Sequence, residues 1–183
     1  MKKWNFLILT LSLLSLSLNI VAIEEEFLTE ISQSIVINKP IDEVYDHVKD
    51  TMNDDTWRNE VREMTADGPF AIGTTYTEVA HIGLNRNFVT KTILVDLRKN
   101  QRAFYITPTD APYFLSSLRE VKKLKSDEID EKNQQSTEFT YTVKFDSRMS
   151  KETLGVNLSP RILEISYGII MKKYLRNLKR YLE

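Results

Sequence analysis

ISQSIVINKPIDEVYDHVKDTMNDDTW, residues 31–57, changes its hydrophobic period at one proline, Pro40. Before the proline, Ile31, Ile35 and Ile37 occupy alternating positions, the pattern of a β-strand with one buried face. Pro40 suits the first position of a helix, because the N–H that it lacks has no intrahelical partner there. After it, apolar residues recur at i, i+3, i+4 and i+7 on one helical face, as Ile41, Val44, Tyr45 and Val48. The stretch therefore predicts a strand that leads directly into a short helix.

Further strands are predicted between Trp57 and Phe145, separated by turn residues. Residues 137–145 give the clearest pattern, because Phe139, Tyr141 and Val143 alternate with polar side chains. Residues 114–124 fit a strand, although their leucine and valine spacing also fits a helix. The other expected strands cover residues 61–64, 74–82, 87–97 and 102–107.

The C-terminal residues predict one long helix. Ser159 is a good N-cap, and Pro160 is a good first helical residue. The early half of this helix is apolar almost all round, so we expect it to be enclosed on more than one side. Its apolar residues are Ile162, Leu163, Ile165, Tyr167, Ile169, Ile170 and Met171. The expected inner face carries Leu163, Tyr167, Ile170, Tyr174, Leu178 and Tyr181.

Strands grouped together, with helices at the two ends of the chain, indicate an α+β fold rather than alternating α/β. An antiparallel sheet whose outer face is polar needs a cover for its inner face. The terminal helix is the only predicted element long enough to provide it. With 183 residues, the chain has the length of about one domain.

Five sequence patterns occur in this order of elements: residues 35–45 (IVINKPIDEVY), Trp57, residues 67–69 (DGP), residues 73–76 (GTTY) and the helix after Ser159. Together they resemble the START-like (SRPBCC, helix-grip) superfamily, and within it the polyketide cyclase/dehydrase and lipid-transport group. The likeness covers roughly Ile31 to Leu182. It implies a curved antiparallel sheet of about six or seven strands wrapped around the long C-terminal helix. It also implies two short helices after the first strand and an apolar ligand held between sheet and helix.

The N-terminal residues form a separate segment. Met1, Lys2 and Lys3 are followed by the apolar run of residues 6–18, the pattern of a secretory signal peptide. We expect residues 1–22 to be a signal peptide, residues 23–30 a linker and residues 31–183 a START-like domain. The alternative for residues 1–22 is an uncleaved membrane anchor, which would give the protein a membrane association. Both interpretations predict a secreted, periplasmic or membrane-anchored protein whose domain lies outside the cytoplasmic membrane.

Composition excludes several function classes. The chain has 25 basic and 26 acidic residues. It therefore lacks the excess of positive charge that would indicate a nucleic-acid partner. Cysteine is absent, which excludes disulfides and thiolate catalysis. The only two histidines, His47 and His81, are too few for a typical histidine metal site, and no nucleotide-binding or nucleophile-elbow motif occurs. We therefore expect no cofactor and no metal, and we predict no catalytic residue.

Polar residues in the predicted strands are the candidates for chemistry inside a cavity. Glu78 shares its parity with Tyr76, so an inward position is possible for its carboxylate. For Asp96, Arg102 and Arg119 we favour the solvated face of the sheet. Residues 53–55 (NDD) are interpreted as a helix-capping turn rather than a metal cluster.

The function expected from these patterns is binding of a hydrophobic small molecule or lipid between the sheet and the C-terminal helix. The alternatives are an enzyme of cyclase or dehydratase type that uses a cavity carboxylate, and a protein-interaction domain with a filled core. The predicted ligand-binding residues are Tyr76, Glu78, Phe104, Ile106, Phe114, Phe139, Tyr141, Val143, Ile165, Ile169 and Tyr174.

Overall fold

A computed structural model describes residues 25–108, 113–124 and 135–183. The predicted signal peptide lies outside these residues. The expected linker falls partly within them, and there it forms structure: a short 3₁₀ turn, η1 (Glu25–Phe27), and the start of the first strand. No helix in the described residues is long and apolar enough to cross a membrane.

Within the described residues, seven strands form one antiparallel sheet in the order β1-β7-β6-β5-β4-β3-β2, which is not closed. From β2 to β7, each strand pairs with its neighbour in sequence. The first strand, β1, pairs with the last one, β7. The strands are β1 (Leu28–Ile37), β2 (Val61–Ala66), β3 (Thr75–Ile82), β4 (Asn85–Arg98), β5 (Arg102–Ile106), β6 (Phe114–Lys123) and β7 (Thr137–Asp146). The segment that also fitted a helix is thus a strand, β6, whose register is fixed by β5 and β7.

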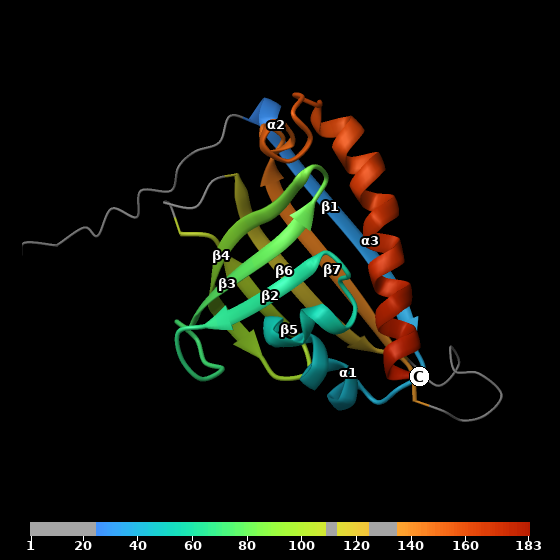
Figure 1. Cartoon of the computed structure of the whole chain (residues 1–183). Coiled ribbons are helices and arrows are strands. Elements are labelled where there is room, and N and C mark those ends of the chain that lie inside the picture. Colours follow the sequence, from blue (N-terminus) through green and yellow to red (C-terminus); the bar gives the residue numbers. More distant parts are fainter. Residues whose placement is uncertain (1–24, 109–112, 125–134) are drawn as a thin grey trace, which may run out of the picture.

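The helices lie at the two ends of the sequence, as expected for an α+β fold. The first strand leads into α1 (Ile41–Val48) and the 3₁₀ helix η2 (Thr51–Thr56). The chain ends with α2 (Met149–Leu154) and the long α3 (Pro160–Leu182). Figure 1 shows α3 running the length of the molecule beside β1, while α1 and η2 lie at the opposite end of the sheet from α2.

The switch of hydrophobic period at Pro40 produces the main core. Ile31 and Ile37 of β1 are buried, and so are Val44 and Val48 of α1. Trp57 is fully buried, and its ring meets the edges of Phe139 and Tyr141 of β7 at centroid distances of 6.1 and 5.5 Å. The opening stretch is therefore packed against the strand that pairs with β1.

The early half of α3 differs from the prediction. Ile162, Ile165 and Ile169 are 51%, 61% and 64% exposed, so this half is not enclosed on more than one side. The physical reason is the position of the helix, which packs mainly along the edge strand β1 and leaves its outer face uncovered. Of the expected inner face, Leu163, Tyr174 and Leu178 are buried. Ile170 and Tyr181 are instead 42% and 57% exposed, so the buried face is narrower than predicted.

Candidate ligand-binding site

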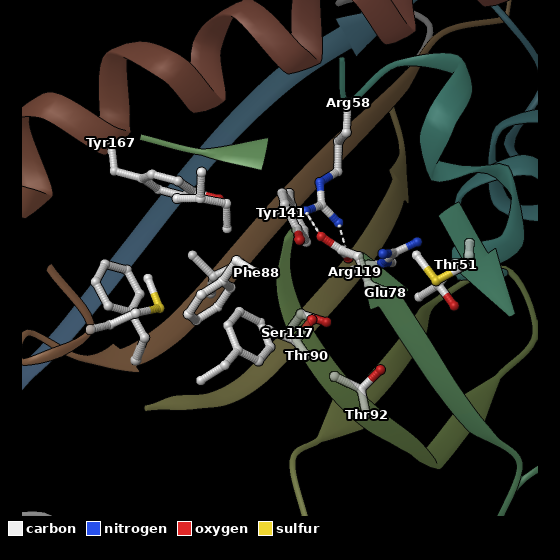
Figure 2. A pocket seen from close by; sticks show the side chains of 16 residues that line it. Thr51, Arg58, Glu78, Phe88, Thr90, Thr92, Ser117, Arg119, Tyr141 and Tyr167 are labelled. Carbon is white, nitrogen blue, oxygen red and sulfur yellow. Dashed lines mark hydrogen bonds and ion pairs between the residues drawn. The ribbon is translucent and has the colours of Figure 1, made fainter. Parts of the chain in front are cut away.

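A small cavity of about 30 Å³ lies between the sheet, η2 and α3. Figure 2 shows charged groups at one end of it, where Arg58, Glu78 and Arg119 lie, and aromatic rings of Phe88 and Tyr167 at the other. Its wall consists of Thr51, Arg58, Met64, Glu78, Ile82, Phe88, Thr90, Thr92, Phe114, Ser117, Arg119, Tyr141, Val143, Phe145, Met149 and Tyr167. A cavity of this size holds about one or two water-sized groups. We call it the inner cavity.

Arg58 organises the charged end. Its guanidinium donates two hydrogen bonds to the carboxylate of Glu78, at 2.7 and 2.9 Å. It also donates to Asp54 at 2.8 Å and to Glu60 at 2.9 Å. A planar guanidinium suits this task, because its five N–H groups diverge toward several carboxylates at once.

Arg119 of β6 binds Asp54, which is also a partner of Arg58. It donates to both oxygens of Asp54, at 2.8 and 2.6 Å, and to the carbonyl oxygen of Val48 at 2.9 Å. The Arg119 residue is 2% exposed and the Asp54 residue 0%. The rings of Trp57, Tyr105 and Tyr141 surround the cation at centroid distances of 5.9, 5.3 and 5.5 Å.

The acidic side chains of this network outnumber the basic ones. Within the described residues, Asp54, Glu60 and Glu78 pair with only Arg58 and Arg119, so full ionisation leaves one excess negative charge. Burial raises the pKa of Glu78 above its ordinary value of 4.5, although the adjacent Arg58 opposes that shift. Glu78 is therefore the group through which the network can become neutral.

Two residues that line the inner cavity each carry a buried polar atom without a protein partner. Arg119 Nε and Thr51 Oγ1 are buried and make no hydrogen bond within the described residues. A buried donor without a partner costs roughly 1–3 kcal/mol. An oxygen atom that enters the cavity and accepts from Arg119 would recover part of this cost.

A second depression lies directly outside the inner cavity, and we call it the outer hollow. Its volume is about 190 Å³, and α2, α3 and the β3–β4 turn form it. It is lined by Glu60, His81, Ile82, Gly83, Phe145, Met149, Ser150, Thr153, Leu154, Leu163, Ser166, Tyr167, Ile170 and Tyr174. Most of this surface is apolar, in contrast to the charged end of the inner cavity.

Four side chains belong to both walls and separate the two spaces: Ile82, Phe145, Met149 and Tyr167. Tyr167 extends from α3 into this partition (Figure 2), and its ring meets Phe145 edge-on at 5.9 Å. Burial raises the pKa of the Tyr167 hydroxyl, which stays neutral at physiological pH.

The structure brings some of the predicted ligand-binding residues to these spaces. Glu78, Phe114, Tyr141 and Val143 line the inner cavity, and Tyr174 lines the outer hollow. Tyr76 and Phe139 are buried in the core and line neither space. The role of these residues in binding stays a prediction.

Four predicted residues lie away from the cavity. In β5, Ala103 and Tyr105 point inward, so Phe104 and Ile106 are on the opposite, outer face. Ile165 and Ile169 are exposed on the outer side of α3. The inward parity of β5 was misjudged because aromatic and aliphatic residues occupy both faces of that short strand.

Sequence reasoning missed the residues that define the charged end. Arg119 was expected on the solvated face, and residues 53–55 were interpreted as a capping turn, yet Arg119 and Asp54 form a buried ion pair. Asp96 and Arg102 do lie at the surface, with side chains 30% and 36% exposed. Strand parity was the available signal, because Ser117, Arg119 and the buried Val121 share one face of β6.

The described residues contain no group of three or more acidic or histidine side chains arranged to hold a metal ion. His47 Nε2 lies 3.0 Å from the hydroxyl of Thr56, and burial lowers the His47 pKa. His81 is part of the outer hollow. Neither histidine has the partners of a typical metal ligand.

Comparison with solved structures identifies the architecture of the chain. A START superfamily protein from Mycobacterium smegmatis matches with a TM-score of 0.61 and 10% identity, over 84% of this chain and 96% of that one. The chain has the START-like, helix-grip fold. No protein-family model and no curated protein matches the sequence.

Two further structures with this START-like fold are aromatase/cyclases. Zhui from Streptomyces sp. R1128 matches with a TM-score of 0.58 and 11% identity, over 85% of this chain and 91% of that one. The di-domain BexL of the BE-7585A biosynthetic pathway matches with a TM-score of 0.56 and 13% identity, over 86% of this chain and 51% of that one. At these identities the likeness concerns the fold alone.

Proposed function

We propose that this START-like protein binds a hydrophobic small molecule or lipid, with the apolar part in the outer hollow and a polar end in the inner cavity. The observation that carries the proposal is the position of an apolar hollow directly beside a charged cavity, with Tyr167 in the partition. Apolar walls with a few convergent polar groups are typical of small-molecule sites.

Size makes Tyr167 part of the proposal. The outer hollow of about 190 Å³ is smaller than the roughly 300 Å³ at which typical ligand pockets begin. A ligand that also reaches Arg119 must displace the side chains that separate the two spaces. Tyr167 projects from a helix with an uncovered outer face, so a change of its rotamer or a small shift of α3 opens the partition.

The charge of the network favours a ligand whose polar end is neutral. Arg58 and Arg119 are already outnumbered by Asp54, Glu60 and Glu78, so an added carboxylate meets excess negative charge. A carbonyl or hydroxyl oxygen can accept from Arg119 Nε without that cost. We therefore propose ketones, esters or alcohols rather than free fatty acids.

Export is a separate part of the proposal. Its support is the basic start and the apolar run within residues 1–22. Expression with a reporter that is active only outside the cytoplasm, compared with a chain lacking residues 1–22, tests it. Equal reporter activity from both chains would contradict export.

A filled-core interaction domain is the second candidate, because the inner cavity holds no more than one or two water-sized groups. A binding experiment distinguishes the two functions. We expect the neutral dye N-phenylnaphthylamine to gain fluorescence with the protein, and mass spectrometry of an organic extract to identify a co-purified hydrophobic compound. The absence of both dye binding and a co-purified compound would favour the filled core.

Two tryptophan variants on α3 localise the binding. Ser166 lines the outer hollow, whereas Glu164, two residues earlier on the same helix, is exposed and lines neither space. Ser166→Trp should weaken dye binding at least about tenfold, because the indole fills the hollow, and Glu164→Trp should leave it unchanged. Equal binding by both variants would place the ligand elsewhere.

The polar end is tested with ligands of equal chain length. Dodecanol and methyl dodecanoate should displace the dye more effectively than dodecanoate near neutral pH. The preference for neutral ligands should decrease in the variant Glu78→Gln, which removes one negative charge. Stronger displacement by dodecanoate would refute the neutral polar end without refuting binding itself.

A further inference from the structure

The outer face of α3 carries a continuous stripe that the site does not use. Ile162, Ile165 and Ile169 are followed by Lys173, Arg176 and Arg180 at spacings of 3, 4, 4, 3 and 4 residues, which keeps all six on one helical face. All six residues are exposed. We call them the α3 stripe. Its first half is apolar, its second half is basic, and the helix lies at the edge of the molecule (Figure 1).

Charge on this helix is segregated. Its exposed residues include one acid, Glu164, and five cations: Arg161, Lys172, Lys173, Arg176 and Arg180. The whole chain has a net charge of only −1. The excess of cations is thus a local property of α3, and it selects an anionic counterpart.

We infer that the α3 stripe docks on an anionic lipid surface, with the isoleucines in the interfacial region and the cations at the headgroup phosphates. A helix with branched aliphatic residues beside clustered lysine and arginine is the pattern of interfacial membrane helices. Protein interfaces are instead enriched in aromatic residues, methionine and arginine and depleted of lysine. The stripe has no aromatic residue and no methionine, and its cations include Lys173 beside two arginines.

The exposed apolar residues continue from the stripe toward the outer hollow. Ile170, 42% exposed, belongs to the hollow's wall, and Leu84 of the β3–β4 turn, beside Gly83 in that wall, is 78% exposed. Docking through the stripe therefore brings the rim of the hollow close to the lipid. The inference itself does not depend on ligand binding, because it rests on exposure and charge alone.

A fluorescent label tests the contact directly, because the full-length chain contains no cysteine of its own. Ile165→Cys places an environment-sensitive dye in the stripe, and Lys91→Cys places it on an exposed residue of β4 as a matched control. With vesicles of phosphatidylglycerol and phosphatidylcholine in equal amounts, the label at position 165 should shift to the blue and the label at position 91 should not. Pure phosphatidylcholine should give a weaker shift, and high salt should reduce the shift on the anionic vesicles.

Charge reversal supplies the affinity measurement. Reversing Lys173, Arg176 and Arg180 to glutamate should weaken sedimentation with the anionic vesicles about 100-fold, because each basic residue near such a surface contributes roughly fivefold. The control reverses Lys91, Lys99 and Lys123, which are exposed on other elements, and changes the net charge equally. Residues 1–24 are present in all variants, so they cannot produce a difference between them.

Three results would overturn the inference. The label at position 165 could remain unshifted on vesicles that sediment the protein, so that another part of the chain makes the contact. It could already be blue-shifted without lipid at high dilution, which would place another segment of the chain over the stripe. It could shift with protein concentration alone, which would make the stripe an interface between two copies.

Discussion

Replacement of Arg119 by methionine should destabilise the protein severely. The substitution keeps a long, flexible side chain but removes three hydrogen bonds, two to Asp54 and one to the carbonyl oxygen of Val48. Asp54 is then left fully buried with Arg58 as its remaining cationic partner. Removing one member of a buried ion pair costs about 3–5 kcal/mol, because the other charge stays desolvated.

Differential scanning calorimetry and urea unfolding measure this loss. For a domain of this size, each kcal/mol lowers the melting temperature by about 2–4 °C, so Arg119→Met should melt roughly 6–20 °C lower. The control is Arg102→Met on the neighbouring strand β5. The Arg102–Asp96 pair is about one third exposed and should contribute less than about 1 kcal/mol.

Equal effects of the two substitutions would refute the buried network. A double-mutant cycle with Asp54→Asn adds a second criterion. Because Asp54 and Arg119 are in direct contact, the loss in the double variant should be smaller than the sum of the single losses by about 1–3 kcal/mol. Strict additivity would show that the two residues do not stabilise each other.

Three further predictions concern the cavity and its walls. Burial raises the pKa of Glu78, so the folded protein binds the proton of the Glu78 carboxyl group more tightly than the unfolded chain does. The stability that this proton contributes is greatest below the ordinary pKa of 4.5 and is lost as pH rises through the raised pKa. Urea unfolding as a function of pH should therefore show a flatter profile for Glu78→Gln, and an unchanged profile would contradict the assignment. Gly83 has a φ of +61°, and an added Cβ would lie 2.5 Å from the carbonyl oxygen of Thr153. Gly83→Ala should therefore lower the melting temperature by several degrees. In the control Gly73→Ala the added Cβ has no neighbour within 4 Å, so this variant should lose only the stability that its own positive φ costs. Tyr167→Ala should join the two spaces and increase the apparent affinity for N-phenylnaphthylamine per folded molecule, and weaker binding would show that the ring is part of the site rather than its partition.

Much of the fold could be predicted from the sequence because local signals agree with it. The period changes at Pro40, and the alternation of Phe139, Tyr141 and Val143 indicates a strand with one buried face. The order of elements then leaves few topologies for one antiparallel sheet and one long helix. The START-like fold and its sheet of about six or seven strands were accordingly confirmed.

The charged end of the cavity could not be predicted in the same way. A buried arginine is exceptional, so a solvated position is the better prior for any arginine in a strand. What overrides that prior is the pairing of Arg119 with Asp54, 65 residues earlier in the chain, and local pattern carries no signal for that contact. The same holds for Arg58 and Glu78, which are 20 residues apart.

The exposed face of α3 was mispredicted for a different reason. A helix that is apolar all round is predicted to be buried on all sides. That prediction fails where some of the apolar residues remain exposed at the surface. Ile162, Ile165 and Ile169 lie beside an edge strand, where the sheet covers just one side of the helix. A large exposed apolar surface of this kind is itself a sign of an interaction site.

In the proposed function Arg119 contributes both to stability and to ligand recognition, and this determines how that function can be tested. Its two terminal NH2 groups donate to Asp54, whereas its Nε makes no hydrogen bond within the described residues. Arg119 also lines the inner cavity. Any substitution at Arg119 therefore alters folding before it alters binding, and a loss of binding in such a variant would be ambiguous. Ser166 is exposed, and among the described residues its hydroxyl donates only to carbonyl groups of its own helix. Substitutions at Ser166 thus change the binding space with little effect on the folded state, and they are the informative test of the proposed function.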